Sequence, residues 1–446
     1  MRRRWDAARV AVVLMAILVA GAARAEVEEP TPRSDLAIPD AARPGPGFDV
    51  ESATQAYLAT LGDADRARSD AYFEGGYWLP LVGLLYDLAV VALLLELGIS
   101  RRLRDLGERA VRWRFVQSTI YGAALVVVAA VLELPLAFWV GFVREHAYGL
   151  SNLTAGAWAV VQVKGLGASL VLAPPAVAVV HAVVRRRAGR WWIPATATAM
   201  VFLVIGLVIT PVFLAPVFND YRPLRPGPVR DAIVSMVRAN GIDAEDVYWF
   251  DASKQTKRIS ANVSGALGTT RISLNDNLLR EASLPEIEAV VGHELGHDVL
   301  HHIGKMVLQL ALLMAAGFAV SQHVYARLLR WRGLRWGLRD GGDIAGLPLV
   351  ALLISAWFVV MTPALNTIVR TAESEADLFG LNAAREPHAF ASVAVKLASY
   401  RKLAPTALEE AIFYDHPSGV PRVRMAMTWF REHPDAGAGG TRASPP

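Results

Sequence analysis

The sequence contains no cysteine, and charged residues make up only 19% of its 446 residues. The absence of cysteine excludes disulfide bridges and thiolate metal sites, so a metal ion would have to be bound by histidine and carboxylate side chains. The sequence also lacks the interleaved basic and aromatic residues of nucleic-acid-binding modules. The formal net charge of +4 is therefore not taken as evidence of nucleic-acid binding, and no nucleic acid partner is expected.

Apolar residues, in contrast, make up 54% of the chain, and the mean hydropathy is +0.33. Several apolar runs exceed about 18 residues, which is long enough to cross the hydrocarbon core of a bilayer as a helix. We therefore expect a mainly α-helical, polytopic membrane protein embedded in the lipid bilayer. The predicted membrane spans are at about 78–98, 119–142, 157–183, 192–215, 304–326 and 346–368.

The N-terminal segment, residues 1–25, has three arginines at positions 2–4, an apolar run over positions 10–19 and an Ala-Arg-Ala sequence before Glu26. This layout is typical of a secretory signal peptide, and an uncleaved first transmembrane helix is the alternative. The chain therefore has six spans, or seven if this segment stays in the membrane. Both interpretations leave Glu26 on the outer side.

Two further segments are expected to contribute little to the fold. Residues 26–48 are rich in Pro, Asp, Glu and Gly and are expected to lack fixed structure, so that residues 26–75 form a linker followed by a polar helix. At the other end of the chain, residues 433–446 are expected to be a disordered tail.

The arginines orient the predicted spans. Loop 143–156, on one side of the membrane, offers only Arg144. The loops on the other side are rich in arginine, and they are 99–118, 184–191 and 327–345. The positive-inside rule places these three loops in the cytoplasm. Segment 216–303 and the C-terminal segment then face a lumen or, in a bacterial inner membrane, the periplasm.

Segment 216–303 has the pattern of a small α+β unit. A helix is predicted over 228–240, ended by Gly241, and strands over 246–250, 258–267 and 271–275, the last two joined by a turn at 268–270. Ser283, Pro285 and Glu286 then resemble a capping box that begins a new helix. This helix is expected to continue past Gly304 into the next membrane span.

The new helix carries His293-Glu294-Leu295-Gly296-His297. Histidines four residues apart share one helix face, about 6 Å apart along the axis, and can both bind one zinc ion. Glu294 then lies near the open position of that ion, where it can act as a general base. We predict one zinc ion per chain, bound in part by His293 and His297.

A catalytic zinc ion needs a third protein ligand, and Glu373 is the candidate after the last span. Asp377 shares its helix face and can accept a hydrogen bond from a ligand histidine, as second-sphere carboxylates do. His301 and His302 are not expected to bind the metal, because His301 lies about 12 Å along the axis from His293.

These motifs resemble those of the CAAX prenyl protease 1 family of integral-membrane zinc metallopeptidases, over most of the chain after about residue 50. The family's H-E-L-G-H matches at His293–His297, and its E-x-x-A-D corresponds to Glu373–Asp377. Its later H-P element with an arginine resembles His416-Pro417 and Arg422. The strand at Asn262 is also similar, although the family's Asn-Ala-aromatic is Asn262-Val263-Ser264 here.

The resemblance implies a ring of membrane helices around a chamber with a zincin-type protease part, and hydrolysis of peptide bonds in membrane-associated or lipid-modified proteins or peptides. It divides the chain into an N-terminal membrane region over 76–215 and a metallopeptidase domain over 216–432. His416 or Arg422 would stabilise the oxyanion, and the strand of Asn262 would pair with an extended substrate.

Other functions remain open from the sequence. A catalytically weak zinc-binding membrane scaffold is one alternative, and a quality-control protease of misfolded membrane proteins is another. A transporter that uses charged residues within its spans is a third, but the sequence shows no inverted repeats or paired broken helices.

Overall fold

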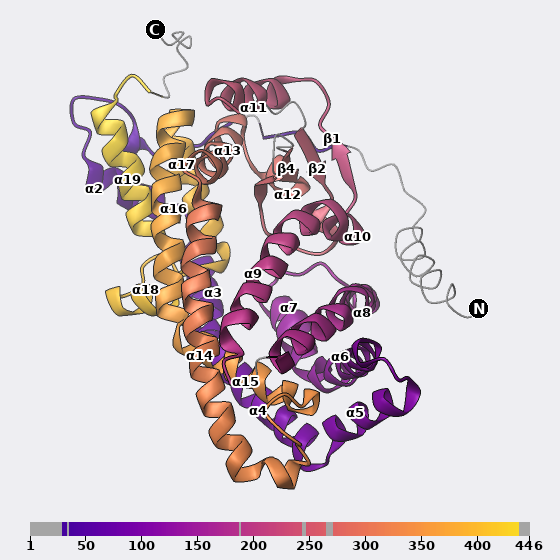
Figure 1. Cartoon of the computed structure of the whole chain (residues 1–446). Coiled ribbons are helices and arrows are strands. Elements are labelled where there is room, and N and C mark those ends of the chain that lie inside the picture. Colours follow the sequence, from indigo (N-terminus) through magenta and orange to yellow (C-terminus); the bar gives the residue numbers. More distant parts are fainter. Residues whose placement is uncertain (1–28, 34, 187–188, 243–246, 265–270, 437–446) are drawn as a thin grey trace.

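The computed structural model describes residues 29–33, 35–186, 189–242, 247–264 and 271–436. The predicted N-terminal signal or span (1–25) and the turn at 268–270 lie outside these residues. Within them, five helical segments are long and apolar enough to cross a membrane, at Asp63–Glu96, Arg114–Ala147, Ala155–Arg186, Trp192–Phe218 and His302–Trp336. They contain the first five predicted spans, so the prediction of a mainly α-helical membrane protein is confirmed (Figure 1).

The membrane part is built from a small number of long helices. Its elements are α3 (Asp63–Gly76), α4 (Leu79–Glu96), α6 (Arg114–Phe138), η2 (Trp139–Arg144), α7 (Glu145–Ala147), α8 (Ala155–Arg186), α9 (Trp192–Ile209), η3 (Thr210–Leu214), α10 (Ala215–Phe218), α14 (His302–Trp336) and α15 (Leu347–Val360). A cavity of about 670 Å³, lined mainly by apolar side chains of α8, α9, α14 and α15, lies between them.

The sixth predicted span, 346–368, is a bent pair of helices. α15 ends at Val360, and α16 (Thr362–Ala384) continues at an angle of 58°. Pro363 lies in the first turn of α16, where it lacks an N–H and disfavours helical backbone in the residue before it. The bend directs the second half of the pair out of the helix bundle and toward α13 (Leu284–Val299).

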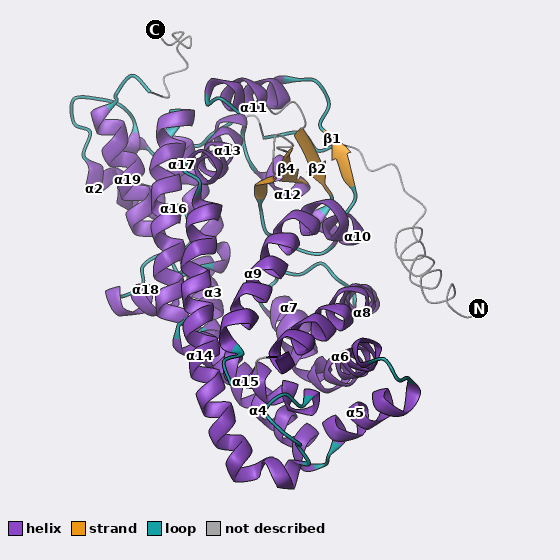
Figure 2. Ribbon diagram, viewed as in Figure 1, coloured by secondary structure: helices purple, strands orange, loops and turns teal. Residues whose placement is uncertain are grey.

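The strands belong to one small sheet at one end of the molecule (Figure 2). Its order is β1-β2-β4-β3, with β2 parallel to β4 and β3 antiparallel to β4, so β3 is an edge strand that lies against α13. The elements of this region are β1 (Tyr221–Pro223), α11 (Pro228–Ala239), β2 (Val247–Phe250), η4 (Ala252–Lys254), β3 (Ala261–Ser264), β4 (Arg271–Asn275) and α12 (Asp276–Glu281).

The helix that follows begins as predicted but does not continue into the membrane. Glu286 accepts a hydrogen bond from the Ser283 backbone N–H at 2.7 Å, which completes the capping box of α13. α13 ends at Val299, and His301 has a left-handed backbone (φ 55°) before α14 begins at His302. The prediction of one continuous helix was wrong, because the chain turns at His301.

Residues 29–33 and 35–48 pack against the rest of the fold, which corrects the prediction that they lack structure, and residues 26–28 and 34 lie outside the described residues. The Arg33 backbone N–H donates to Ala282 O at 3.1 Å, next to the start of α13. η1 (Asp40–Ala42) and α2 (Val50–Leu58) follow, and α2 packs on the C-terminal helices α17 (Pro387–Leu397) and α19 (Gly419–Glu432). Apolar residues explain this packing, because Ala42 of η1 and both Ala53 and Tyr57 of α2 are almost fully buried there.

The C-terminal helices complete this end of the molecule. They are α17 (Pro387–Leu397), η6 (Ala398–Tyr400), α18 (Ala407–Phe413) and α19 (Gly419–Glu432). Of the predicted tail, residues 433–436 are described and Ala436 is buried, while 437–446 lie outside the described part.

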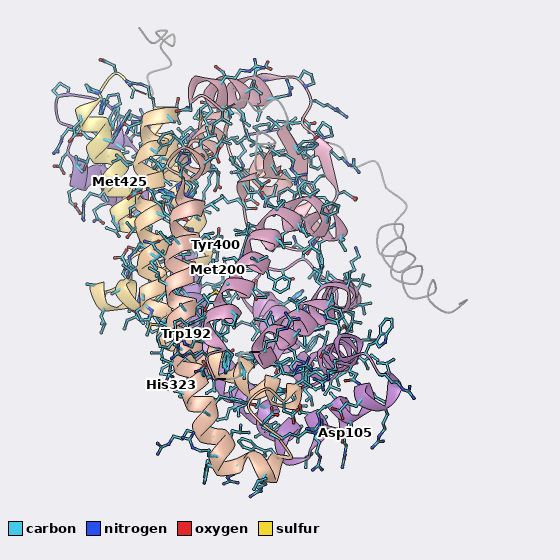
Figure 3. The ribbon with its side chains drawn as sticks, viewed as in Figure 1. Asp105, Trp192, Met200, His323, Tyr400 and Met425 are labelled. Carbon is cyan, nitrogen blue, oxygen red and sulfur yellow. The ribbon has the colours of Figure 1, made fainter. Side chains whose placement is uncertain are left out.

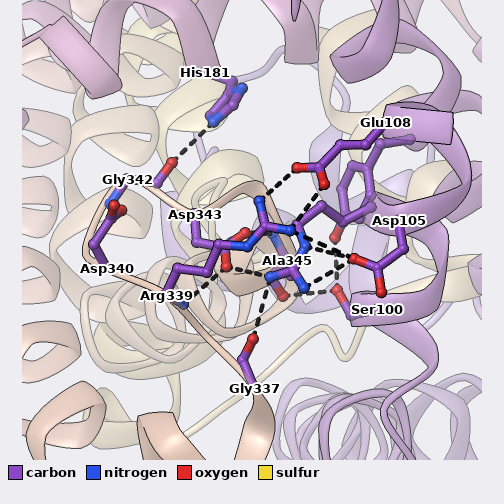
Figure 4. A network of polar contacts seen from close by, with 12 residues as sticks. Ser100, Asp105, Glu108, His181, Gly337, Arg339, Asp340, Gly342, Asp343 and Ala345 are labelled. Carbon is purple, nitrogen blue, oxygen red and sulfur yellow. Dashed lines mark hydrogen bonds and ion pairs between the residues drawn. The ribbon is translucent and has the colours of Figure 1, made fainter. Parts of the chain in front are cut away.

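The arginine-rich loops meet at the end of the molecule opposite the sheet, near α5 (Ile99–Ala110) and η5 (Ile344–Gly346) (Figure 1). Arg104 is buried there against Asp343, and Arg339 makes two hydrogen bonds to Glu108 at 2.6 and 2.8 Å (Figure 4). These contacts join α5 to the turn before α15.

Candidate active site

The site forms where α13 and α16 cross at unusually short range. A Cβ atom on Gly296 would lie 2.9 Å from the Ala376 Cα, and one on Gly380 would lie 2.8 Å from the His293 backbone nitrogen. Gly292 faces Gly380 in the same way. Only residues with very small side chains allow two helix backbones to approach so closely, so these glycines bring the side chains of the two helices together.

The crossing brings the three predicted metal ligands into one cluster. His293 Nε2 lies 3.1 Å from Glu373 Oε2, and His297 Nε2 lies 3.4 Å from Glu373 Oε1. The two Nε2 atoms are 3.3 Å apart. One ligand atom from each residue lies within 4.8 Å of the others. All three donors therefore point at the same small volume.

Asp377 and Arg422 fix the orientation of His293. Asp377 Oδ1 is 2.8 Å from His293 Nδ1, as the sequence predicts for a second-sphere carboxylate. Arg422 donates to both oxygens of Asp377, at 2.8 Å from Nε and 2.6 Å from Nη2, and both residues are buried. Two of its donors are used in this way, and Arg422 also lines the cavity that Glu294 faces.

His302 and Glu375 fix the orientation of His297 in a parallel arrangement. His302 Nδ1 lies 3.0 Å from His297 Nδ1, and its Nε2 lies 3.0 Å from Glu375 Oε2. His302 is almost fully buried. The sequence gives it no role at the metal, and its position depends on the turn at His301 after α13. Its match to a further histidine of the family's motif was the one signal that pointed to it.

Glu294 faces a cavity of about 210 Å³ that His293, His416 and Arg422 also line. Burial raises the pKa of Glu294 to about 7, with Glu373 adding to the effect and His293 opposing it. Burial lowers the pKa of His297 to about 4, which keeps its imidazole neutral. Glu294 is thus a carboxyl group suited to exchanging a proton near neutral pH.

His416 reaches the cluster from the turn after α18. Its Nε2 lies 3.2 Å from Glu373 Oε2, and its Nδ1 lies 2.8 Å from Asp415 Oδ1. Both ring nitrogens face carboxylate oxygens, and a histidine in such surroundings is able to donate from Nε2. The His416 ring is 26% exposed, so it is accessible from the cavity.

Asn262 lies apart from the cluster, with an exposed side chain on the edge strand β3. Its neighbours Ser260 and Ala261 line the same cavity as Glu294. The start of β3 at Ala261 and the residues just before it, rather than Asn262, therefore form one side of the site.

The donor set suits a zinc ion. Two imidazoles and one carboxylate are a common set of protein ligands for catalytic zinc. Glu373 Oε2 is also a buried oxygen with no hydrogen-bond partner among the described residues, although it is directed at the His293 and His416 rings. A buried oxygen without a partner is costly, and a cation at this point would satisfy it.

Comparisons with known proteins agree with this geometry. The family model "Peptidase family M48" matches residues 223–430, and "CAAX prenyl protease N-terminal, five membrane helices" matches residues 55–220. An uncharacterised metalloprotease of Bacillus subtilis, YhfN, is 28% identical over 407 residues, which covers 90% of this chain and 93% of that protein.

Two further matches come from eukaryotes. The CAAX prenyl protease 1 homologue of Oryza sativa is 26% identical over 304 residues, covering 68% of this chain and 71% of the relative. The crystal structure of S. mikatae Ste24p superposes with a TM-score of 0.68 at 22% identity, covering 82% of this chain and 89% of that chain, and so shares the fold. With two family models that together span residues 55–430, the chain belongs to peptidase family M48, as a multi-pass membrane metalloprotease homologous to the CAAX prenyl proteases.

Proposed function

We propose that the chain binds one zinc ion through His293, His297 and Glu373 and uses Glu294 as the general base for peptide-bond hydrolysis. The observation that carries this proposal is the convergence of the three ligand atoms beside the cavity that Glu294 lines. When bound, zinc supplies a Lewis acid that polarises the scissile carbonyl and makes water more acidic.

The residues of the chain then have separate roles in the reaction. Glu294 accepts the proton of the attacking water on its carboxylate and passes it to the leaving amine. His416 donates from Nε2 toward the oxyanion, and Asp377 with Arg422 holds His293 in the orientation that exposes Nε2. An extended substrate segment pairs with the free edge of β3, with Asn262 beside it.

We infer that the substrates are membrane-associated peptides or proteins, some of them lipid-modified. Two features support this. Glu373 lies on α16, the second helix of the bent pair, and a mainly apolar cavity of about 670 Å³ reaches Leu365 on the same helix. The second feature is the name of two relatives, CAAX prenyl protease 1, because that name refers to prenylated sequences.

Replacing Glu294 with Gln tests the catalytic assignment. The Glu294→Gln protein should keep its zinc, because no ligand is changed, and should lose at least about 100-fold in peptide hydrolysis. Zinc content by metal analysis and cleavage of a quenched fluorescent peptide, both on purified full-length protein, measure the two effects. Undiminished cleavage by Glu294→Gln would show that the base lies elsewhere.

We further propose that the site faces the periplasm of a bacterial inner membrane, because the arginine-rich loops gather at the opposite end. The absence of cysteine makes this directly testable with single cysteines. Arg424→Cys, on α19 near the site, should react with a membrane-impermeant maleimide in intact cells. Leu334→Cys, a 96% exposed position near the end of α14, should react only after permeabilisation. The reverse labelling pattern would overturn the orientation.

A further inference from the structure

A second cavity, of about 240 Å³, lies at the arginine-rich end of the molecule, between α5, α6, the end of α8 and the turn before η5. Asp105 on α5, labelled in Figure 3, lies at this end. Most of the lining is polar, and its charged members are four arginines and three carboxylates, namely Arg104, Arg114, Arg185, Arg339, Glu108, Asp340 and Asp343. With histidine counted as neutral, the lining has one positive charge in excess. The candidate active site uses none of these residues.

Two of the four arginines are neutralised by carboxylates of the same cavity (Figure 4). Arg104 forms a buried ion pair with Asp343, and Arg339 donates to both oxygens of Glu108, at 2.6 and 2.8 Å. The third carboxylate, Asp340, accepts a hydrogen bond at 2.8 Å from a backbone N–H of its own turn. The excess positive charge therefore belongs to the other two arginines of the lining.

Those two arginines, Arg114 and Arg185, lie on helix faces that meet. Ser118 is four residues after Arg114 on α6, and His181 is four residues before Arg185 on α8, so each pair shares a helix face. Ser118 Oγ lies 2.8 Å from His181 Nδ1, one turn away from each arginine. A Cβ on Gly342 would lie 3.5 Å from Arg185 Cγ, so this side chain packs on the turn before η5. Within the part of the chain that the structure describes, neither arginine is within ion-pair distance of a carboxylate.

Both arginines lie where a membrane span ends. Arg114 is the first residue of one span, and Arg185 is the last but one residue of the next. The ends of transmembrane helices lie at the depth of the lipid head groups. Trp113 and Phe115, on either side of Arg114, are 63% and 50% exposed, and aromatic side chains are enriched at this depth. The cavity therefore lies at the level of the phosphates of the bilayer.

We propose that this cavity binds the phosphate group of an anionic phospholipid, with Arg114 and Arg185 as the groups that contact it. Guanidinium groups form paired hydrogen bonds to phosphate oxygens, and basic pockets between membrane helices bind lipid head groups. A head group with one net negative charge balances the one excess positive charge of the lining, whereas a zwitterionic head group brings a cation of its own. Binding there requires no particular orientation of the protein, since phosphates lie at both surfaces of a bilayer.

Native mass spectrometry on the full-length protein in a non-ionic detergent tests this site. Palmitoyl-oleoyl phosphatidylglycerol and palmitoyl-oleoyl phosphatidylcholine, which have the same acyl chains, are each titrated, and inorganic phosphate is added as a competitor. Wild-type protein should bind phosphatidylglycerol about tenfold or more tightly than phosphatidylcholine, as expected for charged hydrogen bonds to arginine. Inorganic phosphate should displace little of the bound lipid, because it has no acyl chains to place in the apolar phase.

Arg114→Gln and Arg185→Gln should each remove most of the preference for phosphatidylglycerol. Lysine at either position should keep part of it, because lysine still binds phosphate as a point charge. Arg112→Gln and Arg186→Gln are the matched controls. They make the same charge change at exposed arginines one or two residues away, outside the cavity lining, and should leave the preference nearly unchanged.

Equal affinity of the wild-type protein for the two lipids would overturn the proposal before any variant is made. Equal losses in the cavity variants and the controls would also overturn it, because general attraction between a basic surface and anionic lipid does not depend on the cavity. Complete displacement by inorganic phosphate would show that free phosphate, and not a lipid, is the ligand. Peptide hydrolysis by each variant reports that it is folded, and where a glutamine variant does not fold, the lysine variant at that position decides the comparison.

Discussion

Two buried arginine–aspartate pairs lie at opposite ends of the molecule and serve different purposes. Arg422 and Asp377 lie at the candidate active site, with side chains 9% and 0% exposed. Arg104 and Asp343 lie at the arginine-rich end, with side chains 6% and 2% exposed. As pairs they are nearly equal in burial and contact, so these properties alone do not distinguish a reactive site from a structural one.

The two pairs differ in what each aspartate contacts besides its arginine. Asp377 also contacts an imidazole, His293, whose other nitrogen points at Glu373. Asp343 instead accepts hydrogen bonds from the backbone N–H groups of Arg339 and Ala345, and so fixes a turn (Figure 4). A buried ion pair becomes part of a chemical site when it orients a side chain that still has a free donor or acceptor.

The largest expected effect comes from the matched changes Asp377→Asn and Asp343→Asn. Asp377→Asn should lower zinc affinity by up to about 100-fold, because second-sphere partners of ligand histidines contribute at that scale. Asp377→Asn also leaves the buried Arg422 without its aspartate partner, which costs about 3–5 kcal/mol when a buried pair is broken. Asp343→Asn should cost less, because Arg104 keeps its ion pair with Asp105 at 2.9 Å. Zinc competition with a chromophoric chelator and thermal unfolding measure the two effects.

Asp343→Asn is the control, since it should lose stability at the other end and keep the zinc affinity of the folded protein. Equal loss of zinc affinity in both variants would mean that the two pairs act through stability alone. The contrast between the two ends of the molecule would then be wrong.

Much of the candidate site could be predicted from sequence because helical spacing carries it. His293, His297 and Glu294 follow from one pentapeptide, and Glu373 with Asp377 from another spacing of four, and the structure brings these side chains together. The length of the apolar runs also predicts the spans, since a run of about 20 apolar residues is typical of a transmembrane helix.

Features that depend on distant contacts could not be predicted in this way. The course of residues 29–48 rests on scattered apolar residues that pack against helices more than 300 positions away. The placement of His302 depends on one left-handed residue, His301, and the sequence does not single it out because a positive φ is uncommon in residues other than glycine. The hydrogen bonds from Arg422 to Asp377 could not be predicted from spacing either, because the two residues lie 45 positions apart.

The next effect concerns close helix packing at the two ends. Gly296→Ala places a Cβ 2.9 Å from the Ala376 Cα, and Gly107→Ala places one 2.7 Å from the Gln117 carbonyl oxygen. Both should cost about 1–3 kcal/mol of stability through overpacking. Gly296→Ala alone should also weaken zinc binding, because it pushes α16 and Glu373 away from α13. A loss of zinc affinity in Gly107→Ala would erase this distinction.

A smaller effect is expected from His302, which orients the second ligand histidine. His302→Gln should lower zinc affinity about tenfold, at the weaker end of the range for such partners, since His297 is held by an imidazole where His293 is held by the carboxylate of Asp377. Glu375→Gln should lower zinc affinity by less, because Glu375 contacts His302 rather than a ligand histidine and is 48% exposed. Zinc competition at constant pH ranks the three variants, and an order with His302→Gln above Asp377→Asn would contradict the ranking.

The smallest effect is a pH dependence of stability at the catalytic end, through His388 on α17. Its Nδ1 lies 3.0 Å from the Tyr57 hydroxyl of α2, and burial lowers the pKa of His388 from 6.5 to about 4. Because the unfolded chain binds this proton more readily, the contribution is complete above pH 6.5 and decreases as the pH falls toward 4. At pH 5.5 the loss is about 1 kcal/mol, a shift of a few degrees or less in Tm. Hydrogen exchange should show the loss first in α2 and α17, and not in α5 at the other end. His388→Leu should lack this pH dependence, whereas equal acid sensitivity of α5 would show that the effect is general rather than local.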